Sequence, residues 1–313
     1  MIFLRYILAR LVTALPVLIA VTLFSFLAIK LVPGDPIRIM MRDQVTDEQL
    51  AEIHAKLGMD RPLLVQYASF VGKAAVGDLG QSIIQNQPVS TLVGERIAPT
   101  LLLVSVAVVF SLILAFPVAI ISAARPEGLF DHIVRAFCMV GFAMPHFWVG
   151  LLLMLAFGIK LQLLPIAGYG SGFLEHLVHM ILPGLTIALF LGPILIRSLR
   201  ASLLEALAAD HIEVARARGL PAWRILGKHA LRNALIPTLT VLAVNISWLM
   251  SGAVVTESVF ALPGLGSLLI QAVNFRDYPL MQGLSILLAM TTIGINLLAD
   301  LSYVLVDRRI LRG

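Results

Sequence analysis

The residues whose types and spacing suggest a specific chemistry lie at 198–237, in the sequence SLRASLLEALAADHIEVARARGLPAWRILGKHALRNALIP. Asp210 is predicted to accept hydrogen bonds from the free amides of a new helical turn, and Glu213 can reach back to the same turn. Arg216 and Arg218 follow at the C-terminal end of the same predicted helix. The acidic and basic residues therefore lie at the ends where the helix dipole favours them. The pattern indicates hydrogen bonding and charge complementarity at a surface.

The predicted helix over 211–218 ends at Gly219, which can adopt the left-handed conformation of a C-cap, and Pro221 can open the next helix. In that next helix four residues are expected to share one face: Trp223, Leu226, Ala230 and Ala234. A short, capped helix held between two membrane spans is suited to docking another protein. The same spacing is also consistent with an ordinary solvated loop.

Motifs of catalysis are missing from the sequence. It contains no G-x-x-x-x-G-K-[ST] phosphate loop, no H-E-x-x-H zinc motif and no G-x-S-x-G nucleophile motif. We therefore predict that the chain is not an enzyme and does not hydrolyse ATP itself.

Metal binding is not predicted either. His176 and His179 are spaced to share a helical face, but no third ligand lies nearby in the sequence. The single cysteine, Cys138, excludes a disulfide within the chain and any cysteine-rich metal site. Because it lies in an apolar run, we expect it to be a packed hydrophobic residue.

The composition is that of a polytopic membrane protein. Of the 313 residues 59% are hydrophobic and only 13% are charged, whereas soluble domains average about 25% charged residues. The mean hydropathy is +0.95. The fold class is therefore expected to be all-α.

Six transmembrane helices are predicted from long apolar runs, at 11–29, 100–124, 136–159, 177–196, 238–255 and 280–306. The third run contains Met144-Pro145-His146, which predicts a kink or a re-entrant feature. Arg125, Asp131 and Arg135 mark a short loop before it. We divide the chain into residues 1–98, the first span plus an extracytoplasmic segment with short helices at 46–57 and 62–75, and residues 99–313, a five-helix core.

The positive charges predict the orientation. Arginines and lysines gather at both termini, in the loop near residue 125 and at 198–237. This distribution places both termini and the 198–237 loop in the cytoplasm. Because these residues flank apolar spans, the formal net charge of +5 indicates contact with anionic lipid and not with nucleic acid.

The 198–237 loop also resembles a known motif. Glu213-Val214-Ala215, with Gly219 four residues after Ala215, resembles the EAA loop of ATP-binding-cassette (ABC) importer permeases. The longer string ARARG…HALRNALIP resembles the branch that imports dipeptides, oligopeptides, nickel chelates and glutathione. Two departures are that Val214 stands in place of the first alanine and that the Ile-Pro pair lies further downstream. The strings VPGDP, LGMDRP, GDLGQS, TESVFALPGLG and NFRDYP resemble the same branch, so the likeness covers nearly the whole chain.

The resemblance implies a type I ABC importer permease fold in a bacterial inner membrane. It implies a homologous second permease, an external substrate-binding protein and two ATPase subunits that bind ATP and Mg, with no cofactor in this chain. The short helix of the loop would be the coupling helix that fits a groove on an ATPase. Its expected docking residues are Asp210, Glu213, Ala215, Arg216, Arg218 and Gly219.

Three residues of a second outer segment are candidates for contact with an arriving binding protein or for an outer gate: Glu257, Arg276 and Asp277. Salt bridges that hold the outer loops together are the alternative. The sequence assigns no residue to the substrate path.

Peptides are the substrate that we expect from the resembling branch. Nickel chelates and glutathione remain alternatives, since the string LQLLPIAGYG also looks like nickel-type members. A different class, a secondary transporter driven by an ion gradient, would want paired charges at mid-membrane and two similar halves. The sequence displays neither feature.

Overall fold

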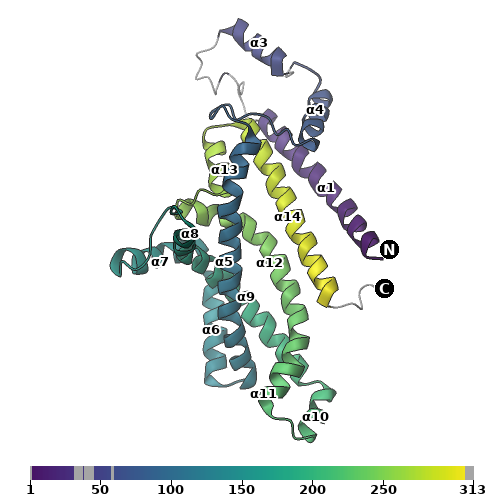
Figure 1. Cartoon of the computed structure of the whole chain (residues 1–313), viewed down its shortest axis with the longest axis vertical. Helices are drawn as coiled ribbons and strands as arrows, with labels where there is room; N and C mark the ends of the chain where they lie inside the picture. The colour runs from purple at the N-terminus through teal and green to yellow at the C-terminus, as the bar shows by residue number, and fades with distance from the viewer. Residues whose placement is uncertain (1, 32–37, 39–45, 58–59, 307–313) are drawn as a thin grey trace. The chain divides into compact units, whose positions relative to one another are not determined.

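The computed structural model describes residues 2–31, 38, 46–57 and 60–306, and their regular structure is helical apart from one isolated bridge, Gln81 to Pro88. The predicted all-α fold is confirmed. The long helices are α1 (Ile2–Leu31), α5 (Val89–Ala124), α9 (Ile181–Leu207), α12 (Leu231–Val259) and α14 (Tyr278–Val306) (Figure 1). The shorter ones are α3 (Asp47–Leu57), α4 (Leu63–Ala75), α6 (Leu129–Ala143), α7 (His146–Leu153), α8 (Phe173–His179), α10 (Asp210–Ala217), α11 (Ala222–Arg224) and α13 (Leu265–Asn274), with two π-helical segments, η1 (Met154–Lys160) and η2 (Ile225–Ala230).

Four helical segments of the described chain are long and apolar enough to cross a membrane: Val89–Ala124, Ile181–Leu207, Ala222–Met250 and Tyr278–Leu297. A fifth span results if the bent pair of Leu129–Ala143 and His146–Lys160 counts as one. The predicted first span lies inside α1, where Val12–Leu27 is a shorter apolar stretch. The prediction of several apolar membrane helices is therefore confirmed, while the count of six stays a prediction.

The third predicted span is broken at Met144 and Pro145. Both residues have extended backbones, with ψ of 128° and 126°, and the helices on either side are bent by 103°. Proline has no N–H to donate, and its ring disfavours helical geometry in the residue before it. The kink predicted from Met144-Pro145-His146 is confirmed.

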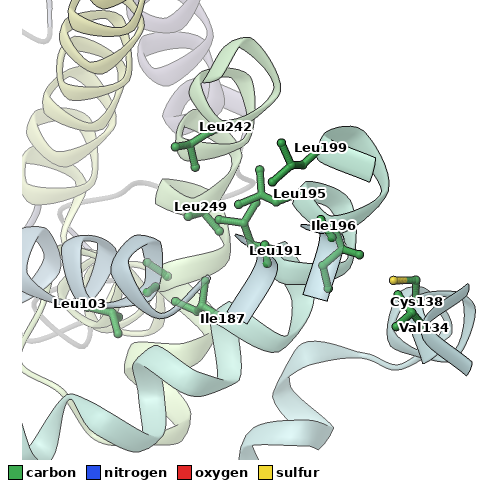
Figure 2. Close-up of a cluster of buried hydrophobic side chains, with 14 of the residues drawn as sticks. Leu103, Val134, Cys138, Ile187, Leu191, Leu195, Ile196, Leu199, Leu242 and Leu249 are labelled. Atoms are coloured by element: carbon green, nitrogen blue, oxygen red, sulfur yellow. The ribbon is translucent and has the colours of Figure 1, made fainter. Parts of the chain in front are cut away.

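The chain forms two compact units, one of residues 1–98 with 264–294 (unit 1) and one of residues 99–263 with 295–313 (unit 2). In unit 2 the core is built around α9. Figure 2 shows Leu191, Leu195 and Leu199 of α9 close to Leu242 and Leu249 of α12. The α9 leucines recur every four residues, so they form one apolar stripe along the helix. The predicted burial of Cys138, which lies beside Val134 on α6, is confirmed.

In unit 1 the core joins the start of α5 to α13 and to the first part of α14. Its buried residues are Val89, Leu92, Val93, Leu265, Leu268, Ala272, Leu280 and Leu284. The predicted helices at 46–57 and 62–75 are present as α3 and α4. Helix α4 packs on α1, where the Phe26 ring lies 5.6 Å from the Tyr67 ring and 6.2 Å from that of Phe70. The Thr22 and Tyr67 hydroxyls are 2.9 Å apart, so they share a hydrogen bond within this apolar contact.

Candidate functional site

The predicted docking helix is α10, Asp210–Ala217, but its first residue is not a cap. The N-cap position is Ala209, with an extended backbone at φ −76° and ψ 144° and no side-chain hydrogen bond. Because Ala208 closes α9, the chain must turn at Ala209, so Asp210 is already helical when α10 begins. The prediction that Asp210 caps the helix is therefore wrong. Asp210 and Glu213 still place negative charge in the first turn, where the helix dipole favours it.

The C-terminus of α10 is closed by a Schellman motif. Gly219 has φ of +73°, which confirms its predicted left-handed conformation. Its N–H donates to the carbonyl of Arg216 at 2.9 Å, and the Leu220 N–H donates to the carbonyl of Ala215 at 3.2 Å. These two bonds satisfy carbonyls that the end of the helix would otherwise leave free. The short helix thus has a fixed end point.

One face of α10 is seated on the protein. Ile212 and Ala215 are 0% and 7% exposed and pack with Ile225 of η2, against partly buried Leu207 and Leu220. We call these five residues the seat. Since Leu207 ends α9 and Ile225 lies in η2, the seat joins α10 to the helices on both sides of it.

The opposite face of α10 is exposed among the residues that the structure describes. Its exposed members are Asp210, His211, Glu213, Val214, Arg216, Ala217 and Arg218. Four of the six expected docking residues, the two acids and the two arginines, therefore lie on this face or at its end. Ala215 lies in the seat instead, and Gly219 shapes the helix end. Figure 1 shows α10 and α11 at the same end of unit 2 as the turn between α5 and α6.

The segment after Pro221 departs from the expected helix face. Pro221 is the N-cap of α11, and the helix widens into the π-helical segment η2 before α12 begins. A π-helical turn shifts the register of the side chains. As a result Trp223 is 70% exposed, with the Arg224 guanidinium 5.3 Å from its ring, while Ile225 is buried. Ala230 and Ala234 are buried, so the prediction that Trp223 shares one face with them is wrong.

A buried charge cluster lies elsewhere in unit 2, between α5, α6 and α9. Asp131 is 0% exposed. Its two carboxylate oxygens accept hydrogen bonds from Nε and Nη2 of Arg200, at 2.5 and 2.6 Å. From the sequence, Asp131 is expected only to mark a short loop, whereas it lies in the first turn of α6 and is buried. Arg200, a charge inside the apolar pattern of α9, was the available signal for a buried partner.

The outer candidates occupy different environments. Glu257 is 1% exposed, and its Oε1 accepts a 2.6 Å hydrogen bond from the Thr100 hydroxyl. Asp277 is also 1% exposed, and its carboxylate accepts hydrogen bonds from Ser82 and from the N–H groups of Ile83 and Ile84. Arg276 is exposed and has φ of +54°. Because Glu257 and Asp277 are buried, their side chains are not accessible to a second protein, whereas Arg276 is accessible.

The two histidines considered for metal binding are turned to different partners. Nδ1 of His176 lies 2.6 Å from the carbonyl of Tyr169, and the two rings stack with centroids 3.8 Å apart. Nδ1 of His179 lies 2.9 Å from the carbonyl of Glu175. Within the described residues, no group of three or more histidine, cysteine or acidic side chains is placed to hold a metal ion.

Comparison with known proteins identifies the chain's relatives. Residues 115–312 match the family described as "Binding-protein-dependent transport system inner membrane component", and residues 3–104 match its N-terminal counterpart. The dipeptide transport system permease protein DppB of Escherichia coli K12 is 34% identical, over 98% of both chains. The oligopeptide transport system permease protein AppB of Bacillus subtilis is also 34% identical, over 97% of this chain and 98% of its own.

A third relative and a solved structure agree with these matches. The di/tripeptide transport system permease protein DppB of Pseudomonas aeruginosa is 36% identical, over 98% of both chains. The MetNI methionine ABC transporter has a chain of similar fold, with a TM-score of 0.57 at 18% identity, over 69% of this chain and 96% of that one. The chain therefore belongs to the family of binding-protein-dependent transport system inner membrane components, the multi-pass inner-membrane permeases of ABC importers.

Proposed function

We propose that this chain is the permease subunit of an ATP-driven importer of di- and oligopeptides and that it forms half of the translocation pathway. The names of the relatives support the substrate class, since three permeases at 34–36% identity are those of dipeptide, oligopeptide and di/tripeptide systems. Identity over nearly the full length supports a shared role of the whole chain.

The observation that carries the mechanism is the seated, capped helix α10. Its inner face is fixed by the seat, and its outer face carries Asp210, Glu213, Arg216 and Arg218. Such a helix can receive a push from a partner without deforming, because the Schellman bonds and the seat fix both its end and its inner face. We assign the outer face to docking on an ATPase subunit. ATP and Mg are bound by that partner, and this chain hydrolyses neither ATP nor peptide.

The seat determines where a push on α10 goes. It contacts the end of α9 through Leu207 and the start of the next span through Ile225. These spans pack against each other along the core of unit 2. Closure of the ATPases would therefore move α10 and tilt α9 and α12 as rigid bodies. This tilting would open the translocation path to the outside, as alternating access requires.

The partners and the topology complete the proposal. A homologous second permease supplies the other half of the pathway, two ATPases dock in the cytoplasm, and a binding protein delivers peptide from outside. Both termini are cytoplasmic. Residues 1–98 form the first span and an extracytoplasmic segment, and residues 99–313 form the permease core. Exposed Arg276 is our candidate for contact with the binding protein, and buried Glu257 and Asp277 hold the outer segments in shape.

A cysteine cross-linking experiment tests the docking role. Val214 on the outer face is 52% exposed, so Val214→Cys is expected to cross-link to the ATPase in the assembled complex. Ser258→Cys is the matched control, an exposed and nearly isosteric change at the other end of α12. The natural Cys138 is buried and does not compete. A complex that imports peptide but gives no cross-link at Val214→Cys would overturn the docking role.

The substrate is tested by uptake into proteoliposomes that contain the whole complex with its binding protein. Labelled di- and tripeptides are expected to accumulate with ATP. Glutathione and a nickel chelate, the two alternative substrates, are tested for uptake in the same way. Accumulation of either of these, without peptide uptake, would replace peptide as the substrate and leave the docking role intact.

A further inference from the structure

The cluster around Asp131 is more elaborate than a single ion pair. The Ser122 hydroxyl at the end of α5 donates to Oδ1 of Asp131, and the Glu127 N–H in the following turn donates to Oδ2 at 3.1 Å. Nε of Arg135 lies 3.6 Å from Oδ2. With the two bonds from Arg200, one carboxylate thus connects the end of α5, the α5–α6 turn, α6 and α9.

We propose that Asp131 and Arg200 are a positioning pair that makes the α5–α6 turn move together with α9, and hence with α10, when the ATPases act. The inference rests on the proposed function, because it assumes that α10 receives the push. It adds a connection that the seat does not make, since the seat contains no residue of α5 or α6.

The path along α9 is short and stiff. Arg200 lies seven residues before Leu207, or about 10 Å at the helical rise of about 1.5 Å per residue. Leu207 belongs to the seat of α10. The residues between them, ASLLEA, contain neither proline nor glycine. A displacement of α10 is therefore carried to Arg200 without an obvious hinge.

The other end of the connection is equally well defined. Glu127 has a backbone φ of +61°, a conformation that residues other than glycine seldom adopt. Its N–H is held in this position by Asp131. The same carboxylate that binds Arg200 therefore fixes the shape of the turn, so the turn and α9 have a common anchor.

A role in stability alone does not explain why Asp131 and Arg200 form a buried pair with two parallel hydrogen bonds. A buried ion pair contributes little net stability relative to apolar side chains of the same volume, because both charges lose their hydration. Its distinctive property is direction, since the planar guanidinium matches a carboxylate in one orientation with two parallel bonds. Such a pair specifies how two helices are placed relative to each other, which is what a coupling element needs.

The test uses the whole importer with the double variant Asp131→Asn, Arg200→Gln, which removes both charges together and leaves no unpaired ion. Three quantities are measured: assembly with the ATPases, cross-linking at Val214→Cys, and the ATP hydrolysed per peptide imported. We expect normal assembly and cross-linking but a ratio of ATP to peptide raised about tenfold or more. Arg197→Gln, the same chemical change on an exposed residue of α9, is expected to keep the natural ratio.

Arg200→Lys separates direction from charge. It retains the positive charge but loses the two parallel bonds, so we expect a ratio between those of the natural protein and the double variant. A natural ratio in the assembled double variant overturns the proposal. If the double variant does not assemble, Arg200→Lys decides: a raised ratio supports the positioning pair, and a natural ratio overturns it. Failure of the complex that carries Val214→Cys alone, with Asp131 and Arg200 intact, to cross-link would instead count against the docking role of α10.

Discussion

The hydroxyl of Ser82 donates a 2.5 Å hydrogen bond to Oδ2 of Asp277, a residue 195 positions further along the chain. The same carboxylate accepts from the N–H groups of Ile83 and Ile84, at 3.4 and 3.3 Å, and from that of Leu280 at 3.4 Å. Asp277 therefore fixes the segment before α5 against the start of α14 within unit 1.

We predict that Asp277→Ala lowers the stability of the protein by about 2–4 kcal/mol, because it leaves two buried and two partly buried donors without their acceptor. Asp277→Asn retains one acceptor oxygen, so it should lower the stability by less than Asp277→Ala does. The measurement is the thermal midpoint of the purified protein in detergent. Asp60→Ala, at an exposed position, is the control. Equal midpoints for Asp277→Ala and the control would show that the four hydrogen bonds contribute nothing.

Gly184 on α9 allows close packing with α5. An added methyl group would lie 2.7 Å from Cγ1 of Val106 and 3.4 Å from the Phe110 ring. Valine has little freedom about χ1, so the two helices would have to separate. Gly184→Ala is expected to destabilise unit 2 by about 1–3 kcal/mol, seen as a lower thermal midpoint.

Gly192 on the same helix provides the matched control for that prediction. It is also buried, but within the described part of the chain an added methyl group meets no atom within 4 Å. Gly192→Ala should therefore stabilise α9 by about 0.5–1 kcal/mol through helix propensity alone. Opposite signs at the two glycines are the expected result, and a loss of stability at both would refute the packing argument.

Gly219 is predicted to matter for its backbone and not for space. No atom of the described residues lies within 4 Å of an added methyl group, but φ is +73°. Gly219→Val should therefore cost about 1–2 kcal/mol locally, disturb the Schellman bonds and reduce peptide uptake per ATP hydrolysed. Gly219→Asn, which tolerates this conformation, should transport nearly normally. Normal coupling in Gly219→Val, at normal expression, would contradict a role for the fixed end of α10.

The loop before α9 should respond to acid. The N–H and hydroxyl of Ser171 both donate to Oε2 of Glu175 at 2.8 Å, which lowers the pKa of Glu175 below its ordinary value. Because the folded pKa is depressed, the loop's added stability is present at neutral pH and is lost as the pH falls through that pKa. Nuclear magnetic resonance of ¹³C-labelled glutamate should report a low midpoint for Glu175, and Ser171→Ala should raise it. An unchanged midpoint in that variant would exclude the hydroxyl as a cause.

The sequence by itself determined the features that depend on local composition. Long uncharged runs predict membrane helices because unpaired backbone groups are not tolerated in lipid. Pro145 determined the break in the third span, and Gly219 the end of α10, since each acts through its own backbone geometry. These predictions needed no knowledge of distant residues.

Only the tertiary structure decided which charges are solvated and which are buried. Asp131 and Arg200 are 69 residues apart, and no local pattern pairs them. In the same way, the carboxylate of Asp277 accepts hydrogen bonds from Ser82 and from the N–H groups of Ile83 and Ile84. Trp223 turns outward because η2 changes the helical register. Burial is a property of packing between distant segments, so the same carboxylate can be a surface group or the anchor of three helices according to what the fold brings beside it.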